Sequence, residues 1–146
     1  MNDDKLVGFC ILHVDDFLVA GSSDSLRELV RKLNGRFKFR KLESNRFKFT
    51  GLNIEQQEYT LLVDQIDFIN GIKPIISLRA GKKSSEEKVN KEEMKQYCGL
   101  TGQLDWAAEN TRSDLAYDVR EMATRNKDAS LKDIQKKNKV LKKAQK

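Results

Sequence analysis

The sequence predicts an α+β fold in which antiparallel hairpins and one packed helix are followed by an all-helical region. Two short apolar runs, residues 6–12 and 17–20, flank an acidic turn, as in a β-hairpin. Beyond residue 90 the apolar residues recur only at helical spacing. The chain has 146 residues, of which 38% are hydrophobic, so it can form one ordinary domain or two small ones.

The rest of the first half should contain one helix and further strands. Ser23 or Asp24 can cap a helix whose Leu26, Leu29, Val30 and Leu33 share one face, and Gly35 should end it. Residues 36–42 alternate between basic and apolar side chains, which predicts a half-buried strand. Residues 47–63 predict a second hairpin around a polar loop at residues 55–57, with a bulge or a close backbone approach at Gly51.

Helix signals dominate the second half. Asp64 can start a short helix that Gly71 and Pro74 end. Further helices are expected from three capping signals, which are Asn90 with Glu93, Ser113, and Ser130 with Asp133. Gly99 and Gly102 would permit close packing of the helix that contains them. We divide the chain into residues 1–63, 64–80, 81–90 and 91–146, with the charged linker 81–90 as the subdomain boundary.

Charge and cysteine content narrow the class of protein. The formal net charge is +6, and residues 127–146 account for all of it, with eight Lys against two Asp. Overall basicity is therefore a poor guide to where a nucleic acid would bind. Cys10 and Cys98 lie in apolar surroundings and predict buried, reduced thiols rather than a zinc site or a disulfide. No signal peptide or membrane span is recognisable, so an intracellular, cytoplasmic protein without membrane contact is expected.

The acidic turn contains the adjacent carboxylates of Asp15 and Asp16. Nucleotidyl transfer by polymerases uses two divalent ions, and Mg²⁺ prefers carboxylate oxygens, which such a turn would present. Asp is also a common turn residue, and on spacing alone a plain turn is the favoured interpretation.

The neighbouring residues change that balance. Residues 11–22 resemble the aromatic-x-Asp-Asp box of copia-type reverse transcriptases. Four later segments look like the family's subsequent motifs, in the same order. These are residues 47–54 (aromatic-Leu-Gly-Ile), 65–69 (Gln-x-x-Tyr-Ile, with Phe68 for Tyr), 97–104 (Tyr-Arg and Gly-Ser-Leu) and 111–116 (Thr-Arg-Pro-Asp-Ile). Residues 139–141 echo the helix that leads to ribonuclease H. Five weak motifs in register cover most of the chain.

The resemblance implies a partial polymerase palm over residues 1–63, the start of the thumb over 64–80, and a helical thumb or connection region over 91–146. It implies that Asp15 and Asp16 are catalytic ligands of Mg²⁺ or Mn²⁺. By the same resemblance, His13 and Val14 would lie near the incoming nucleotide and primer end, and Phe49, Gly51 and Leu52 would belong to a primer-grip-like hairpin.

The implied partners are an RNA or DNA primer-template, a deoxynucleoside triphosphate and the remainder of a Pol polyprotein, within a virus-like particle. Two departures stand out. His13 replaces the family's Tyr, and Ser113 replaces its Pro. The family's other metal-binding Asp and its fingers precede the hairpin and are not found in this sequence. We therefore expect this chain alone to be inactive as an RNA-directed DNA polymerase.

Six basic side chains interleave with phenylalanines between residues 36 and 48. They are Arg36, Lys38, Arg40, Lys41, Arg46 and Lys48. This composition suits phosphate contact with base stacking, while an ordinary amphipathic sheet explains it equally well. The Lys-rich C-terminal helix has the same two interpretations, with a solvated face favoured.

Two rival functions remain open. Receiver domains also place an acidic pair after an apolar strand, but there the pair leads directly into a helix, whereas residues 17–20 form another apolar run. The stronger rival is a catalytically inactive remnant that acts as a nucleic-acid-binding or protein-binding module.

Overall fold

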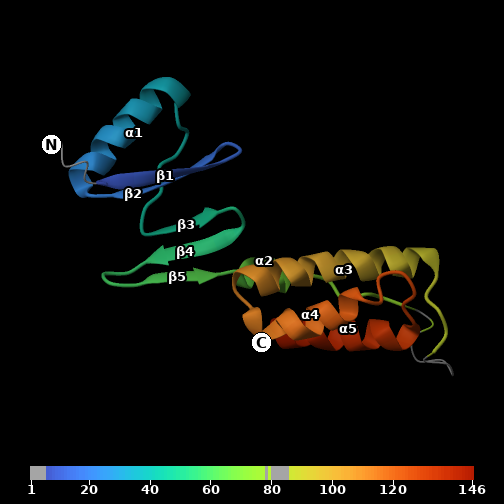
Figure 1. Ribbon diagram of the computed structural model, residues 1–146. Coiled ribbons are helices and arrows are strands. Elements are labelled where there is room, and N and C mark those ends of the chain that lie inside the picture. The colour runs from blue at the N-terminus through green and yellow to red at the C-terminus, as the bar shows by residue number, and fades with distance from the viewer. Residues whose placement is uncertain (1–5, 78, 80–85) are drawn as a thin grey trace. The chain divides into compact units, whose positions relative to one another are not determined.

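The computed structural model describes residues 6–77, 79 and 86–146, and these form two compact units (Figure 1). The N-terminal unit is Met1–Val63 and the C-terminal unit is Asp64–Lys146. The α+β class is confirmed, because two small antiparallel sheets precede a helical region. The division falls at residue 63, not within the linker 81–90, because Ile69, Ile72 and Ile75 belong to the core of the helical unit. Residues 81–85 of that linker lie outside the described residues.

The first hairpin forms as predicted. Strand β1 (Gly8–His13) pairs antiparallel with β2 (Asp16–Gly21), from Gly8 opposite Gly21 to His13 opposite Asp16. Val14 and Asp15 alone make the turn. The antiparallel pairing differs from the parallel βα units of a receiver domain.

Helix α1 (Ser23–Phe37) extends two residues beyond Gly35, and this corrects two predictions. Arg36 and Phe37 are helical and residues 38–45 are irregular, so the strand expected at 36–42 is absent. The helix ends at Lys38, whose φ of 47° is left-handed and whose N–H donates to the carbonyl of Asn34. The Asn34 side chain then accepts from the N–H of Phe39 at 2.9 Å, so helix-end hydrogen bonds take the place of a strand ladder.

The second sheet has the order β3-β4-β5, formed by β3 (Arg46–Phe49), β4 (Leu52–Gln56) and β5 (Leu61–Asp64). The predicted hairpin loop at residues 55–57 is shifted, because Glu55 and Gln56 continue β4 and residues 57–60 connect β4 to β5, with the N–H of Gln57 donating to the carbonyl of Thr60 at 2.8 Å. A second turn, which the sequence did not predict, joins β3 to β4 at Thr50 and Gly51. Both residues have positive φ, and Gly51 serves this turn rather than a bulge.

The C-terminal unit consists of α2 (Ile66–Gly71), α3 (Lys91–Asn110), the 3₁₀ turn η1 (Ser113–Leu115), α4 (Ala116–Ala123) and α5 (Leu131–Ala144). Asn90 with Glu93 and Ser130 with Asp133 form the two expected capping boxes. Ser113 does not cap a helix, because it lies inside η1 after Arg112. None of the described helices is long and apolar enough to cross a membrane.

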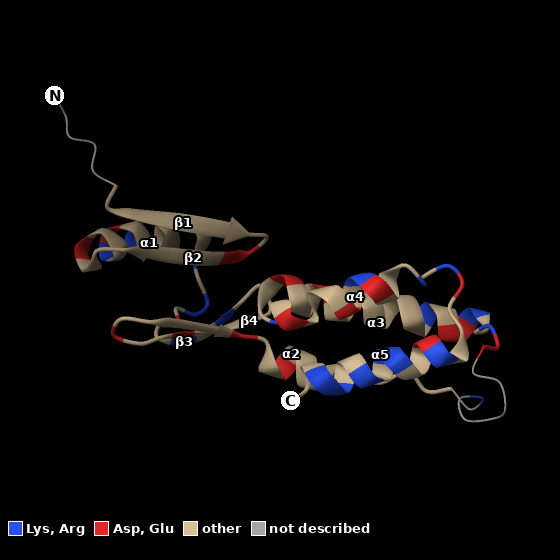
Figure 2. Cartoon of the chain, turned by 60° about the horizontal axis from the view of Figure 1, so that its bottom comes forward, with Lys and Arg blue, Asp and Glu red and all other residues tan. Residues whose placement is uncertain are grey.

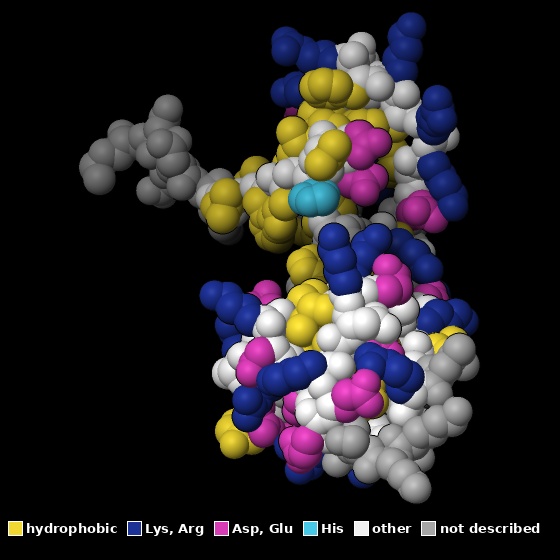
Figure 3. Space-filling model, turned by 90° about the vertical axis from the view of Figure 1, so that its right-hand side faces the viewer, with side chains coloured by type: hydrophobic (Ala, Val, Ile, Leu, Met, Phe, Trp, Pro, Cys, Tyr) yellow, Lys and Arg dark blue, Asp and Glu magenta, His cyan; other side chains and the backbone are white. Residues whose placement is uncertain are grey.

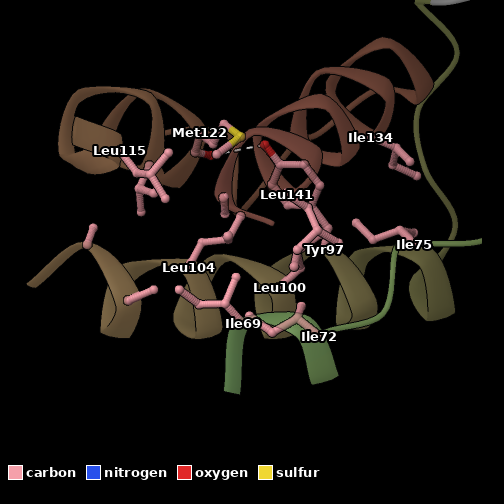
Figure 4. Close-up of a cluster of buried hydrophobic side chains, with 14 of the residues drawn as sticks. Ile69, Ile72, Ile75, Tyr97, Leu100, Leu104, Leu115, Met122, Ile134 and Leu141 are labelled. Atoms are coloured by element: carbon pink, nitrogen blue, oxygen red, sulfur yellow. Dashed lines mark hydrogen bonds between the residues drawn. The ribbon is translucent and has the colours of Figure 1, made fainter. Parts of the chain in front are cut away.

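The core of the molecule lies in this helical unit (Figure 4). Tyr97, Leu104 and Leu115 are completely buried, and Ile134 and Leu141 of α5 are 1% exposed. Hydrogen bonds also fasten α5 to the segment after α2, because Asn138 donates to and accepts from the backbone of Ile75 at 2.9 Å. Gly99 and Gly102 take no part in this packing, since a Cβ added at either glycine would meet no described atom within 4 Å.

The N-terminal unit has far less interior. Ile54 is its single buried hydrophobic residue among those described. Many other apolar side chains of this unit are more than 40% exposed. A two-stranded sheet with so little burial is marginally stable by itself, which bears on its interactions below.

Candidate functional site

The β1-β2 turn holds the acidic pair in the position that the sequence predicts. Asp15 occupies the second residue of the turn and Asp16 begins β2 opposite His13. Both carboxylates are exposed, and neither makes a hydrogen bond or ion pair within the described parts of the chain. Two adjacent carboxylates with all their lone pairs available are therefore presented at the hairpin tip.

Val14 holds this turn in a strained conformation. Its φ of 54° is left-handed, and its side chain is 85% exposed. A branched Cβ makes that region costly, on the order of 1–3 kcal/mol, and hairpin turns that need positive φ at the first position usually have Gly there. Exposed Val14 gains no packing in the described structure to offset the strain, so the turn has a sequence that local stability alone does not explain.

Aromatic side chains connect the turn to the second sheet of the same unit. The His13 ring meets the Phe49 ring edge-on, with centroids 6.4 Å apart and planes at 71°. Phe49 pairs with Leu52 at the end of the β3-β4 hairpin, next to Gly51. The structure thus brings His13, expected near a primer end, next to Phe49 of the primer-grip-like residues. Figure 3 shows the chain's one histidine, in cyan, beside acidic and apolar side chains.

A cluster of three phenylalanines packs at the start of β2, beside the acidic turn. Phe17, directly after Asp16, lies 5.3 Å from the Phe37 ring and 5.2 Å from the Phe39 ring. Phe37 and Phe39 come from the end of α1 and the residues that follow it. Their spacing of two residues produced the strand prediction, and in the structure it brings both rings onto Phe17. This packing fixes the strand that begins with Asp16.

The carboxylates of Asp15 and Asp16 are the right type of ligand for a hard divalent cation, but two carboxylates are fewer than such a site usually has. Carboxylate oxygens are the preferred ligands of Mg²⁺ and Mn²⁺. No group of three or more His, Cys, Asp or Glu side chains that could hold a metal occurs among the described residues. At least one further protein ligand would be needed to complete a site with the usual carboxylate count.

The six basic residues predicted to contact nucleic acid are all exposed, but they do not share one sheet face. Arg36 ends α1, Lys38, Arg40 and Lys41 are in the irregular segment, and Arg46 and Lys48 belong to β3. Lys41 pairs with Glu43 at 2.6 Å, and Arg46 lies 3.9 Å from Glu55. The side chains of Arg36, Lys38 and Arg40 have no partner in the described structure. These three form the available cationic group, which we call the helix-end basic group.

Lysines also line α5, as Figure 2 shows. Several of them are neutralised, since Lys132 pairs with Glu86 and Lys143 with Asp118, each at 3.0 Å. Lys139, Lys142 and Lys146 have no carboxylate within 4.0 Å among the described residues. The expectation of a largely solvated helix therefore fits this face in part.

The prediction that both cysteines are buried is wrong, because Cys10 and Cys98 are exposed free thiols. Cys10 is on the two-stranded sheet, where no layer covers it, and Cys98 lies on the outer side of α3, where its Sγ reaches the carbonyl of Asn126 at 3.4 Å. The apolar neighbours in sequence did not imply burial, since in β1 those neighbours are exposed as well.

A buried lysine is the feature that the sequence reasoning missed. Lys137 of α5 is 0% exposed, and its Nζ donates to the carbonyl of Tyr97 at 2.9 Å and to the Thr101 hydroxyl. The ammonium also lies 3.0 Å from the centre of the Tyr97 ring. Burial lowers the pKa of Lys137 to about 7. Its position three residues after Ile134 and four before Leu141, both inward, was the available signal.

A cavity of about 240 Å³ lies in the same helical unit, lined by residues of α3, α4 and α5. Its charged lining is mixed, with Asp118, Glu121 and Asp133 against Arg125 and Lys136. It includes none of the residues predicted as a site. Mixed signs and existing ion pairs leave no net preference for an anionic or a cationic ligand.

Comparison of the chain with protein-family models, curated proteins and solved structures finds no match.

Proposed function

We propose that the chain is the palm and thumb part of a copia-type reverse transcriptase, with Asp15 and Asp16 as its contribution to a polymerase metal site. The strained turn carries this proposal. A branched residue at φ 54° next to two adjacent, unpaired carboxylates is costly for folding alone, and such strain concentrates at functional sites. The N-terminal unit would correspond to a partial palm, and the C-terminal unit to the thumb and connection.

In this proposal Asp15 and Asp16 would hold Mg²⁺ or Mn²⁺ through their carboxylate oxygens. When bound, such ions activate the primer hydroxyl and neutralise charge on the triphosphate. The hairpin would set the separation of the two carboxylates, and the packing of Phe17 against Phe37 and Phe39 would help to hold the start of β2 in place. The His13 ring, held edge-on by Phe49, would offer a flat surface for a base or sugar at the primer end.

Primer extension tests this proposal. We expect no extension by the chain alone with Mg²⁺ or Mn²⁺, because Asp15 and Asp16 have no third ligand nearby in the described structure. Extension should appear when the chain is mixed with a matching segment from a related element that supplies the remaining carboxylate and the fingers. Activity of the chain alone would contradict its incompleteness, and failure of the mixture, despite a demonstrated complex, would contradict the polymerase assignment.

A second candidate function is nucleic-acid binding without catalysis, and the helix-end basic group favours it. Arg36, Lys38 and Arg40 have no partner in the described structure and lie close in sequence to Phe37, which is 57% exposed. Exposed cations beside an exposed aromatic ring match the general pattern of single-strand binding surfaces.

Replacing all three basic residues by Gln should weaken binding of a primer-template and make it less dependent on salt. Each phosphate that is no longer neutralised should reduce the slope of log affinity against log salt by about 0.7–0.9. Fluorescence anisotropy over a salt series measures both quantities. The matched control changes Lys139, Lys142 and Lys146 to Gln, which removes the same charge from the other unit. A larger loss of affinity in the control than in the test variant would move the binding surface to the C-terminal end of the chain.

A further inference from the structure

Strand β1 has an outer edge that the described structure leaves unpaired. The first sheet has only two strands, and β2 occupies one side of β1. Phe9, Ile11 and Leu12 of β1 are 53%, 46% and 59% exposed. Apolar edge strands are usually covered, shortened or protected by charge, because their free backbone groups template pairing with another strand.

The backbone register identifies the groups that face outward. The N–H of Ser22 donates to the carbonyl of Val7 at 3.1 Å, so the backbone groups of Val7 are directed toward the β2 side. Antiparallel ladders alternate, and Phe9, Ile11 and His13 therefore also face β2. Gly8, Cys10 and Leu12 direct their N–H and C=O groups to the open edge. This edge offers three donors and three acceptors in a regular row.

The charge pattern points to a neutral partner strand. Residues 6–14 contain no Asp, Glu, Lys or Arg, and the strand lacks the Lys or Pro that commonly protects an edge. The N-terminal unit as a whole is nearly neutral, with ten Lys and Arg against nine Asp and Glu. Electrostatic repulsion between two such units is therefore small, whereas a charged partner strand would face apolar side chains.

The same uncharged run is self-complementary about its centre, which is Cys10. An antiparallel copy aligned there would place Cys10 opposite Cys10, Gly8 opposite Leu12 and Phe9 opposite Ile11. Cys10, Gly8 and Leu12 are the outward-facing residues, so both chains would use all their free edge groups in hydrogen-bonded pairs. The Phe9-Ile11 pairs combine an aromatic with a β-branched side chain, which is a favourable cross-strand contact.

We propose that β1 is a dimerisation edge, at which two copies of the chain join their first sheets into one four-stranded antiparallel sheet in the order β2-β1-β1-β2. The outer edge of β2 is less suited to this role. β2 begins with the charged Asp16, and charged residues protect an edge strand against pairing. This inference goes beyond the proposed polymerase function and does not depend on it.

The two exposed cysteines provide a matched cross-linking test in the full chain. In the proposed dimer the Cys10 Cα atoms would be about 5.5 Å apart, within the range for a disulfide. Under mild oxidation, Cys98→Ser, which keeps Cys10, should form a covalent dimer, and Cys10→Ser, which keeps Cys98, should remain monomeric. Equal cross-linking of both variants would show collision of exposed thiols and would overturn the proposal.

Light scattering during size exclusion gives an independent readout without cross-links. The reduced chain should have about twice the monomer mass of 16.8 kDa at high concentration. Leu12→Lys places a charge on the outer edge and should restore the monomer, while far-ultraviolet circular dichroism stays unchanged. Cys10→Pro removes one outward N–H without touching the β2 ladder and should act likewise. A chain that stays monomeric, or one whose dimer survives both substitutions, would overturn the proposal.

Discussion

Replacing Lys137 with Met should stabilise the C-terminal unit more at pH 6 than at pH 9, by about 3 kcal/mol. Lys137 is fully buried, and burial lowers its pKa to about 7 from an ordinary value of 10.5. Below pH 7 the amine is charged in both folded and unfolded chains, so the full cost of burying the charge is present. Between pH 7 and 10.5 the folded chain has released this proton and the unfolded chain keeps it. Stability of the parent should therefore rise with pH across this window, and Met removes the effect.

The contacts of Lys137 explain why its charge is poorly compensated. Its partners are a carbonyl, a hydroxyl and the face of the Tyr97 ring, and no carboxylate lies within ion-pair distance among the described residues. Burial has the largest effect on the pKa of Lys137, and the opposing influence of Cys98 and Asp133, which raises this pKa, is smaller. Burial also raises the pKa of the Tyr97 hydroxyl, which donates to the carbonyl of Met122 and stays neutral over this pH range. One protonation change thus dominates the window.

Denaturant unfolding at pH 6, 7, 8 and 9 measures this difference. Trp106 in α3 is the only tryptophan of the chain, so its fluorescence reports the helical unit and not the sheets. Lys136→Met is the matched control, because Lys136 is the exposed neighbour on the same helix. The control should follow the pH dependence of the parent. An unchanged pH dependence in the Lys137 variant would mean that this amine does not titrate near neutrality in the folded chain.

Lys137 also shows where sequence reasoning stops. Local signals located most helices of the C-terminal unit, because a capping box such as Asn90 with Glu93 is formed by residues three apart. Burial of a lysine depends on what the neighbouring helix places opposite it. Here Tyr97 and Thr101, some 40 residues earlier, supply the acceptors. Charge alone suggested solvent for Lys137, and only its place on the apolar stripe of α5 opposed that suggestion.

In the N-terminal unit, an alternating sequence pattern predicted a strand where the structure has the end of a helix. Phe37 and Phe39 alternate with basic residues, which predicts a strand, and the structure uses the same alternation at a helix end. Two residues of a period are too few to separate these outcomes, because a chain leaving a helix can also direct every second side chain to one neighbour. The turn between β3 and β4 was missed for a related reason. It needed positive φ at Thr50, which no residue preference indicates.

The acidic hairpin was the best-predicted part of the candidate site, and its strain was the least predictable. Apolar runs on both sides of Asp15 and Asp16 were enough to place the pair at a turn. The contact of His13 with Phe49 required the second sheet, which sequence spacing located only roughly. Val favours extended backbone, so nothing local indicated a left-handed Val14. The left-handed conformation of Val14, which best supports a functional role, is thus one that the backbone preference of Val does not predict.

The strained turn at Val14 presents Asp15 and Asp16, and the second main prediction concerns the loss of their charges. In the enzyme reconstituted with the complementing segment, Asp15→Asn and Asp16→Asn should each reduce primer extension by at least about a hundredfold, since loss of a residue that merely orients a metal ligand already costs 10–100-fold. Each change keeps the shape of the side chain and removes its negative charge. Neither carboxylate has a hydrogen bond or ion pair within the described structure, so the hairpin should keep its fold. Primer-template affinity should stay close to that of the parent.

Asp24→Asn is the matched control for this pair. Asp24 is an exposed acidic residue in the first turn of α1, within the same unit but away from the hairpin turn, and its loss should leave extension nearly unchanged. Single-turnover extension at saturating primer-template separates chemistry from binding, and a Mg²⁺ titration should activate the parent and the control but neither Asn variant. Full extension by either Asp15→Asn or Asp16→Asn would remove that residue from the metal site. Loss of primer-template binding in both would instead assign the pair a structural role, because a metal ligand acts on the transition state rather than on docking of the duplex.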